Sequence, residues 1–196
     1  MKTTSNAIEI LNGLVDDDCG EASLFWTFRP SNAEQLRRDI YAAFADAVYP
    51  GDDNITISGC PCGECSETRA FFAGKHWREV AATGQPFHLG WGGLAILSPE
   101  AWRFYLPAYM ILSLKGDGDP GETLECALYQ LSPDPAETPS DFFTERTRAF
   151  TAAQRECLAA YTCAAVDAGA EDAAFEAAAA YWKGQAAGTK AEQGAV

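Results

Sequence analysis

The sequence predicts a compact helical domain around one buried central helix, either mainly α or α+β with one small sheet. Two observations support this prediction. Apolar residues recur at helical spacing in several segments, whereas strand-like alternation is weak and short. The segment after Ser98 is also apolar nearly all round, which is typical of a helix that is covered on every side. With 47% hydrophobic residues, the chain can bury a core without a stabilising metal.

We expect three parts along the 196 residues. Residues 1–30 form an N-terminal extension, residues 31–183 a single helical domain, and residues 184–196 a disordered tail. The last assignment follows because disorder concentrates at chain ends that nothing ties down.

The domain is predicted to begin with a helix over residues 31–48. Ser31 and Glu34 are spaced as a capping box, which satisfies backbone donors at a helix start. The apolar residues of this helix recur every four positions on one face: Leu36, Ile40 and Phe44. Three shorter elements follow, a candidate strand over 54–58 and helices over 64–73 and 76–82.

The central helix is predicted for residues 99–114. Ser98 suits the N-cap, and Pro99 suits the first helical position. Pro107 lies inside the segment and removes one backbone hydrogen bond, so we expect a kink or a break there. Three further helices are predicted, over 122–131, 151–167 and 171–183. Thr151 with Gln154 gives the second of these a capping box.

The formal net charge is −14, and the acidic excess is spread along the whole chain. Such a surface repels nucleic-acid backbones and anionic membranes, so we expect neither to be bound directly. A basic protein is the natural partner, because opposite potentials speed encounter. Solubility alone also explains the charge. The acidic residues that would contact a partner first are Asp16, Asp17, Asp18, Asp52, Asp53, Glu171 and Asp172.

Neither a signal peptide nor an apolar stretch of about 20 residues is recognisable, which predicts a cytoplasmic protein. Its seven cysteines are then expected to be reduced thiols. The odd number also argues against a closed set of disulfides.

Cys60, Cys62 and Cys65 are the sharpest local feature of the sequence. Thiols so close together, separated by turn-forming residues, can converge on one cation, and thiolates are preferred ligands of structural zinc. Zinc takes four ligands in such sites, and His76 is the nearest candidate for the fourth. The alternative reading is a helix cap whose thiols are buried as small hydrophobic groups.

Other chemistry at these residues remains open. Cys157 or Cys163 can replace His76 as the fourth ligand if the C-terminal helices pack nearby. Cys62 and Cys65 are spaced C-x-x-C at the start of a helix, which lowers a thiol pKa and suits redox chemistry. A cysteine nucleophile needs a histidine base, and the chain offers only His76 and His88.

Four motifs resemble those of a bacterial family of uncharacterised proteins. They are Cys62-Gly-Glu-Cys65, Gly74-Lys75-His-Trp77, Leu97-Ser-Pro-Glu-Ala-Trp102 and Tyr105-Leu-Pro-Ala-Tyr109. The resemblance covers residues 31–165, and its Tyr-Leu-Pro-Ala-Tyr piece is the most specific. It implies no activity, and it implies that Cys62 and Cys65 are the shared thiols while Cys60 is an addition.

The sequence therefore favours a non-enzymatic acidic protein that binds and neutralises a protein partner, as immunity and inhibitor proteins do. No familiar catalytic or nucleotide-binding motif is present to favour an enzyme. The alternative is a metal- or thiol-dependent protein that uses the loop from Cys60 to Cys65, with zinc as the expected metal.

Overall fold

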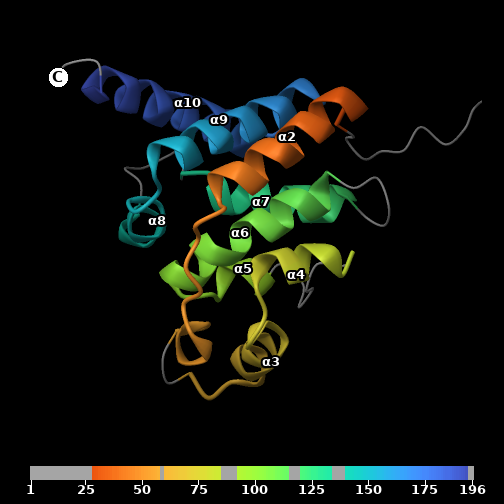
Figure 1. The fold of residues 1–196 in the computed structure, drawn as a ribbon, viewed down its shortest axis with the longest axis vertical. Helices are drawn as coiled ribbons and strands as arrows, with labels where there is room; N and C mark the ends of the chain where they lie inside the picture. The colour runs from red at the N-terminus through yellow and green to blue at the C-terminus, as the bar shows by residue number, and fades with distance from the viewer. Residues whose placement is uncertain (1–27, 58–59, 85–91, 115–119, 134–139, 194–196) are drawn as a thin grey trace, which may run out of the picture.

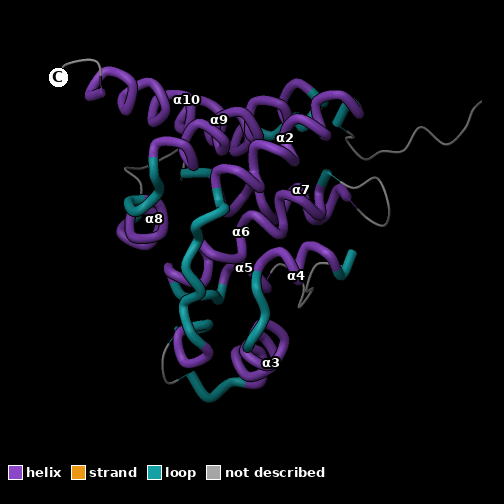
Figure 2. The backbone as a smooth tube through the Cα atoms, in the orientation of Figure 1, coloured by secondary structure: helices purple, strands orange, loops and turns teal. Residues whose placement is uncertain are grey.

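The computed structural model describes residues 28–57, 60–84, 92–114, 120–133 and 140–193 (Figure 1). All regular elements in these ranges are helical, as the tube in Figure 2 shows. The helices are α2 (Pro30–Ala43), η1 (Asp52–Asn54, a 3-10 turn), α3 (Gly63–Phe72), α4 (Trp77–Ala82), α5 (Gly92–Ala95), α6 (Pro99–Ser113), α7 (Pro120–Leu131), α8 (Asp141–Thr147), α9 (Ala152–Asp167) and α10 (Ala173–Gln193). The mainly α fold class is confirmed.

The helices form stacked layers. Figure 1 shows α2, α9 and α10 side by side at one end, α6 and α7 in the middle, and α3 at the far end. The packing agrees, because α9 contacts both α2 and α10, while α6 contacts α2, α4, α5, α7 and α8. None of the described helices combines the length and apolar character that a bilayer span requires.

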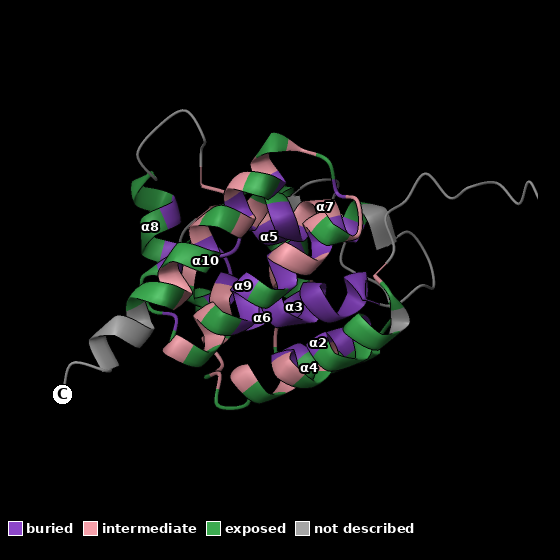
Figure 3. Cartoon of the chain, turned by 90° about the horizontal axis from the view of Figure 1, so that it is seen from above, coloured by how far each residue is buried: buried purple, intermediate pink, exposed green. Residues whose placement is uncertain are grey.

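Helix α6 is the central element that the sequence predicted. The Ser98 hydroxyl oxygen accepts the N–H of Ala101 at 3.1 Å, so the predicted cap is present. Every residue from Phe104 to Ser113 is buried, and Figure 3 shows this helix enclosed by its neighbours. The helix continues through Pro107 without interruption, so the break allowed by the sequence does not occur.

The start of α2 differs from the prediction. Pro30 is its first residue and Arg29 its N-cap, and no side chain caps it, so the capping box of Ser31 and Glu34 is wrong. Proline has the backbone angle that a first helical residue needs, which starts the helix one residue earlier. The helix also ends at Ala43 rather than near residue 48. Its predicted apolar face is confirmed, since Leu36, Ile40 and Phe44 are all buried.

The candidate strand over 54–58 is not formed in its described part. Residues Asp52–Asn54 make a single 3-10 turn, and an isolated bridge joins Thr56 to Leu97. One further backbone bond, from Ser98 N–H to the Ile55 carbonyl at 2.9 Å, fixes the segment against the start of α6. The segment therefore serves as an anchor rather than as part of a sheet.

The C-terminal helices follow the prediction more closely. Helix α9 has both bonds of the capping box between Thr151 and Gln154. Helix α10 runs to Gln193, so its predicted end at Lys183 is too early. Its alanine-rich sequence has high helix propensity, and Trp182 anchors it by donating to the Leu131 carbonyl at 2.9 Å. The short helices α5 and α8 have too few residues for a periodic pattern and were not predicted.

A buried arginine joins α5, α7 and α8. Arg146 is only 3% exposed, and its guanidinium donates to the carbonyls of Ala95 and Leu97 at 2.6 and 3.1 Å. A further bond, to the Gln130 side chain, measures 2.6 Å, and the guanidinium lies 3.9 Å from the Phe142 ring centre. Burial lowers the pKa of Arg146 to about 10, which still leaves it charged at neutral pH.

We predict that Arg146→Met lowers the free energy of unfolding by about 3 kcal/mol. The buried carbonyls that accept hydrogen bonds from Arg146 would lose their donor and could not bond to water instead. Urea denaturation followed by circular dichroism measures this difference. Arg148→Met is the matched control, since Arg148 is exposed on the same segment and should change stability by less than about 0.5 kcal/mol. Equal effects of the two substitutions would contradict the role of Arg146.

Candidate functional site: a three-cysteine cluster and an acidic groove

The structure brings Cys60, Cys62 and Cys65 together at the start of α3. Their sulfur atoms all lie within 4.8 Å of one another, and the Sγ atoms of Cys60 and Cys62 are 3.2 Å apart. Cys62 is exposed, Cys60 is half-buried and Cys65 is buried. Such a group can hold a metal ion.

Local backbone structure explains this convergence. Cys62 is the N-cap of α3, and its sulfur accepts the N–H of Cys65 at 3.4 Å. From the next turns of α3, Arg69 reaches back to the chain before the helix. It donates to the Thr56 hydroxyl at 2.8 Å and to the Cys60 carbonyl at 3.3 Å. The helix cap and the arginine therefore hold the two arms of the loop together.

Cys60 and Cys65 differ in acidity. Hydrogen bonds from the Cys62 backbone and then from the Cys62 and Cys65 side chains lower the pKa of Cys60. The hydrogen bond with Cys60, followed by burial, raises the pKa of Cys65 to about 12. Cys60 therefore ionises more readily than Cys65.

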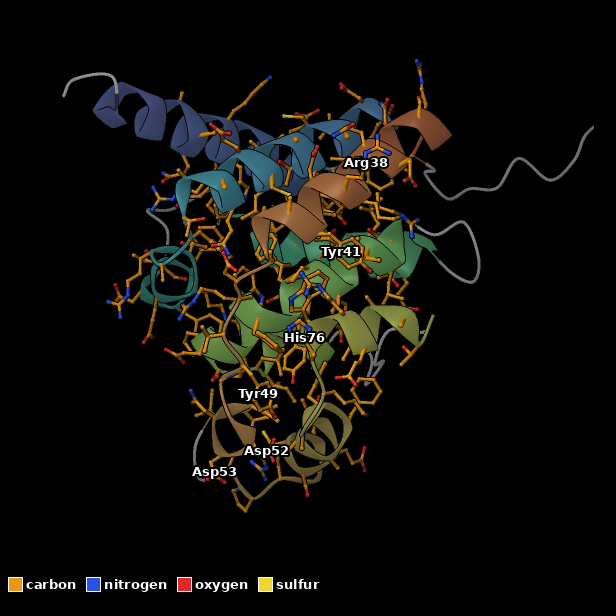
Figure 4. The ribbon with its side chains drawn as sticks, viewed as in Figure 1. Arg38, Tyr41, Tyr49, Asp52, Asp53 and His76 are labelled. Atoms are coloured by element: carbon orange, nitrogen blue, oxygen red, sulfur yellow. The ribbon has the colours of Figure 1, made fainter. Side chains whose placement is uncertain are left out.

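His76 does not join the cluster. It is the N-cap of α4, where its Nδ1 accepts the N–H of Arg78 at 3.1 Å. Its ring lies 5.2 Å from that of Phe104, and burial is the main cause that lowers its pKa. Figure 4 places it nearer the middle of the molecule than Asp52 and Asp53. The observed role of His76 is to begin a helix.

The other proposed ligands and bases lie elsewhere. Cys157 and Cys163 belong to α9, and neither is part of the sulfur group. Burial raises the pKa of Cys157 to about 12, as expected for a thiol packed in the core. His88 lies outside the described residues. Among the residues that the structure describes, no histidine, cysteine or carboxylate joins the three sulfurs as a fourth ligand.

The acidic residues proposed for partner contact have separate roles. Asp52 accepts the Tyr49 hydroxyl and also the Gly74 N–H at 2.8 Å, and these bonds hold its pKa below the usual value. Asp172 accepts the N–H of Ala174 at 2.7 Å, at the start of α10, and the Tyr129 hydroxyl at 2.8 Å. These two carboxylates therefore stabilise the fold through internal hydrogen bonds.

The remaining proposed acids are less engaged. Asp53 and Glu171 are exposed. They stay available to a partner from opposite parts of the chain, since Asp53 follows α2 and Glu171 precedes α10. Asp16, Asp17 and Asp18 lie outside the described residues. Of the proposed acids that the structure describes, Asp53 and Glu171 are thus exposed, while Asp52 and Asp172 bond within the fold.

Several basic side chains are used inside the protein. Five of them donate to main-chain carbonyls: Arg69, Lys75, Arg103, Arg146 and Arg155. Arg37 and Arg38 face Glu34 on α2 at 3.7 and 3.2 Å. Five of the 14 basic residues thus bond to the main chain, and the acidic excess of the protein follows from its 28 acidic residues.

A groove that the sequence did not indicate lies between the end of α2, α6 and the start of α9. It has a volume of about 380 Å³. Its lining residues are Asp46, Ala47, Val48, Tyr49, Pro50, Asn54, Glu100, Arg103, Phe104, Ala149, Thr151 and Gln154. Val48 is 85% exposed at this groove, and Asp46 and Glu100 are exposed beside it. The groove combines an exposed apolar side chain with acidic neighbours. These residues come from segments that are far apart in the sequence.

Comparison with known proteins gives one match. A family model described as a family of unknown function, DUF6714, matches residues 63–186. No curated protein and no solved structure matches the chain. The expected resemblance to an uncharacterised family is confirmed, but the match lies further toward the C-terminus than the expected 31–165. It includes Cys65 and begins just after Cys62.

We predict that iodoacetamide labels Cys60 and Cys62 of the native, reduced protein well before Cys126. Cys60 and Cys126 are both half-buried, but burial raises the pKa of Cys126 to about 11, whereas the pKa of Cys60 is lowered. Because the thiolate is the reactive form, labelling of Cys60 should persist at lower pH than that of Cys126. Peptide mass spectrometry across a pH series measures both rates, and equal rates would contradict the prediction.

Proposed function

The chain belongs to the DUF6714 family, whose function is unknown, and from its own residues we propose that it binds a basic protein partner and blocks it, as an immunity or inhibitor protein does. The proposal concerns a binding role without chemistry of its own. The observation that carries it is the division of charge. The chain has a net charge of −14, and several of its basic side chains donate hydrogen bonds to its own main-chain carbonyls.

This division of charge supports recognition at long range. Acidic residues outnumber basic ones by 28 to 14, so the net field of the protein is negative. A surface of one sign raises the rate at which an oppositely charged protein arrives and disfavours partners of like charge. A basic enzyme active site or nucleic-acid-binding channel is the kind of surface that such a domain can cover.

The groove beside Val48 supports a defined contact at short range. Binding energy in protein interfaces is concentrated in a few central residues that lose contact with water. Val48 has an apolar surface to bury, and Asp46 can pair with a basic side chain beside it, whereas Glu100 already faces Arg103 at 3.4 Å. The occupant that fits is a partner segment with an apolar side chain flanked by lysine or arginine.

We predict that a tagged form of the protein retains one basic protein from source cells at low salt and releases it at high salt, because salt screens the attraction of exposed charges. Mass spectrometry of the bound fraction measures its identity and stoichiometry. A variant with Asp53→Asn and Glu171→Gln should release it at lower salt. Retention of an acidic protein would count against the proposal. Binding that does not weaken as the salt concentration rises would count against it as well.

We predict that Val48→Asp weakens the binding of that partner by about tenfold or more, as for a central interface residue. Ile57→Asp is the matched control, because Ile57 is also strongly exposed, at 58%, but lies outside the groove. Titration calorimetry with the purified partner compares the two variants. If Ile57→Asp weakens binding as much as Val48→Asp, the groove is not the contact.

A second candidate function rests on the cysteine cluster. Three sulfurs within 4.8 Å are compatible with a metal- or thiol-dependent protein that uses the loop from Cys60 to Cys65. Zinc is the first metal to consider, because thiolates are its preferred protein ligands. This function uses other residues than the proposed binding of a basic protein, so the two candidates can be tested separately.

A further inference from the structure

We propose that Cys60, Cys62 and Cys65 bind one soft cation, Zn²⁺ or Cu⁺, through three thiolates and leave its remaining coordination position open. The proposal rests on the second candidate function and deepens it by naming the class of ion and the form of the site. Soft sulfur ligands select these ions over Mg²⁺ or Ca²⁺, which prefer oxygen.

The spacing of the sulfurs fits such an ion. Zinc–sulfur bonds of about 2.3 Å place the sulfurs of a tetrahedral site about 3.8 Å apart. Here one pair of sulfurs is 3.2 Å apart, and all three lie within 4.8 Å of one another. Shifts of about 1 Å in these side chains, one on the loop and two at the start of α3, therefore bring all three to bonding distance.

The surrounding structure already fixes the two arms of the site. Cys62 and Cys65 belong to the first turn of α3, so the helix sets their separation. Cys60 comes from the preceding loop, and its carbonyl and the Thr56 hydroxyl are both held by Arg69. This guanidinium also places a positive charge near a site that carries several negative charges when occupied. The site is thus organised before the ion arrives.

The open position follows from what the structure places nearby. Within the described residues, the sulfur group has no fourth protein ligand. His76 uses its Nδ1 to cap α4, and Cys157 is buried in α9. Cys62 is exposed, so solvent or a small external ligand can reach the bound ion. Structural zinc sites are closed by four protein ligands, whereas an open site allows exchange.

The test is an anaerobic titration of the full-length, reduced protein with Zn²⁺ and, separately, with Cu⁺, each against a chromophoric chelator. We predict one equivalent bound per chain for at least one ion, and the tighter ion identifies the cation. In Cys62→Ser/Cys65→Ser this binding should be lost. Serine is itself a good N-cap, so α3 should survive the change, and circular dichroism checks this.

Cys126→Ser/Cys163→Ser is the control, because it also removes two thiols, here half-buried ones that lie outside the cluster. It should retain full binding. Cobalt substitution tests the open position: the visible spectrum of the cobalt form should change when imidazole is added. If imidazole leaves the spectrum unchanged, the proposal that one coordination position is open is contradicted.

No stoichiometric binding of either ion, or binding that survives the loss of Cys62 and Cys65, would overturn the site itself. The proposed binding of a basic protein is tested separately from the metal site, by the pull-down. If the metal site fails while Cys62 and Cys65 still form a disulfide with oxidised glutathione and return to thiols with reduced glutathione, a thiol-dependent function stands without the metal. Failure of the pull-down leaves the metal result unaffected.

Discussion

The constraint on which this structure depends is that α6 must be covered on every side. Its residues from Phe104 to Ser113 are all buried, so water must be excluded around its whole circumference. Burial of apolar surface is the dominant favourable contribution to folding. Helices α2, α4, α5, α7 and α8 all pack on α6, and the pair of α9 and α10 closes the layer above α2 and α7. The positions of the other helices follow from this requirement.

The same constraint positions the cysteine cluster. Tyr105 on α6 is buried with a hydroxyl that needs a partner, and it donates to the carbonyls of Phe72 and Lys75, each at 2.9 Å. These carbonyls lie at the end of α3 and just before α4. Asp52 holds the same junction through the Gly74 N–H. One end of α3 is thus fixed to the core, and its other end, which carries the cysteines, projects away from it (Figure 1).

Much of this fold could be predicted because it depends on local signals. The spacing of Leu36, Ile40 and Phe44 identifies a buried face, and Thr151 with Gln154 identifies a helix start, without knowledge of any distant residue. Ser31 shows the limit of such signals, because Pro30 competes for the same helix start and prevails.

The candidate site could be predicted only in part, for the same reason. The three cysteines are close in sequence, and a short loop before a helix brings them together. The groove unites residues of the α2 end, α6 and α9, so only the tertiary packing creates it. Asp52 and Asp172 were identified as surface acids, since no sequence pattern reveals that Gly74 and Tyr129 lie beside them.

Charge connects the two functional surfaces. A chain of net charge −14 disfavours further anions, so each thiolate that forms in the cluster works against the field of the whole protein. Arg69 offsets this locally, and the first turn of α3 offers N–H groups that favour negative charge. A bound cation would neutralise more of it than either, and the acidic surface would raise the local concentration of cations around the site. The charge that would steer the proposed basic partner toward this domain therefore also favours a metal ion at its cysteines.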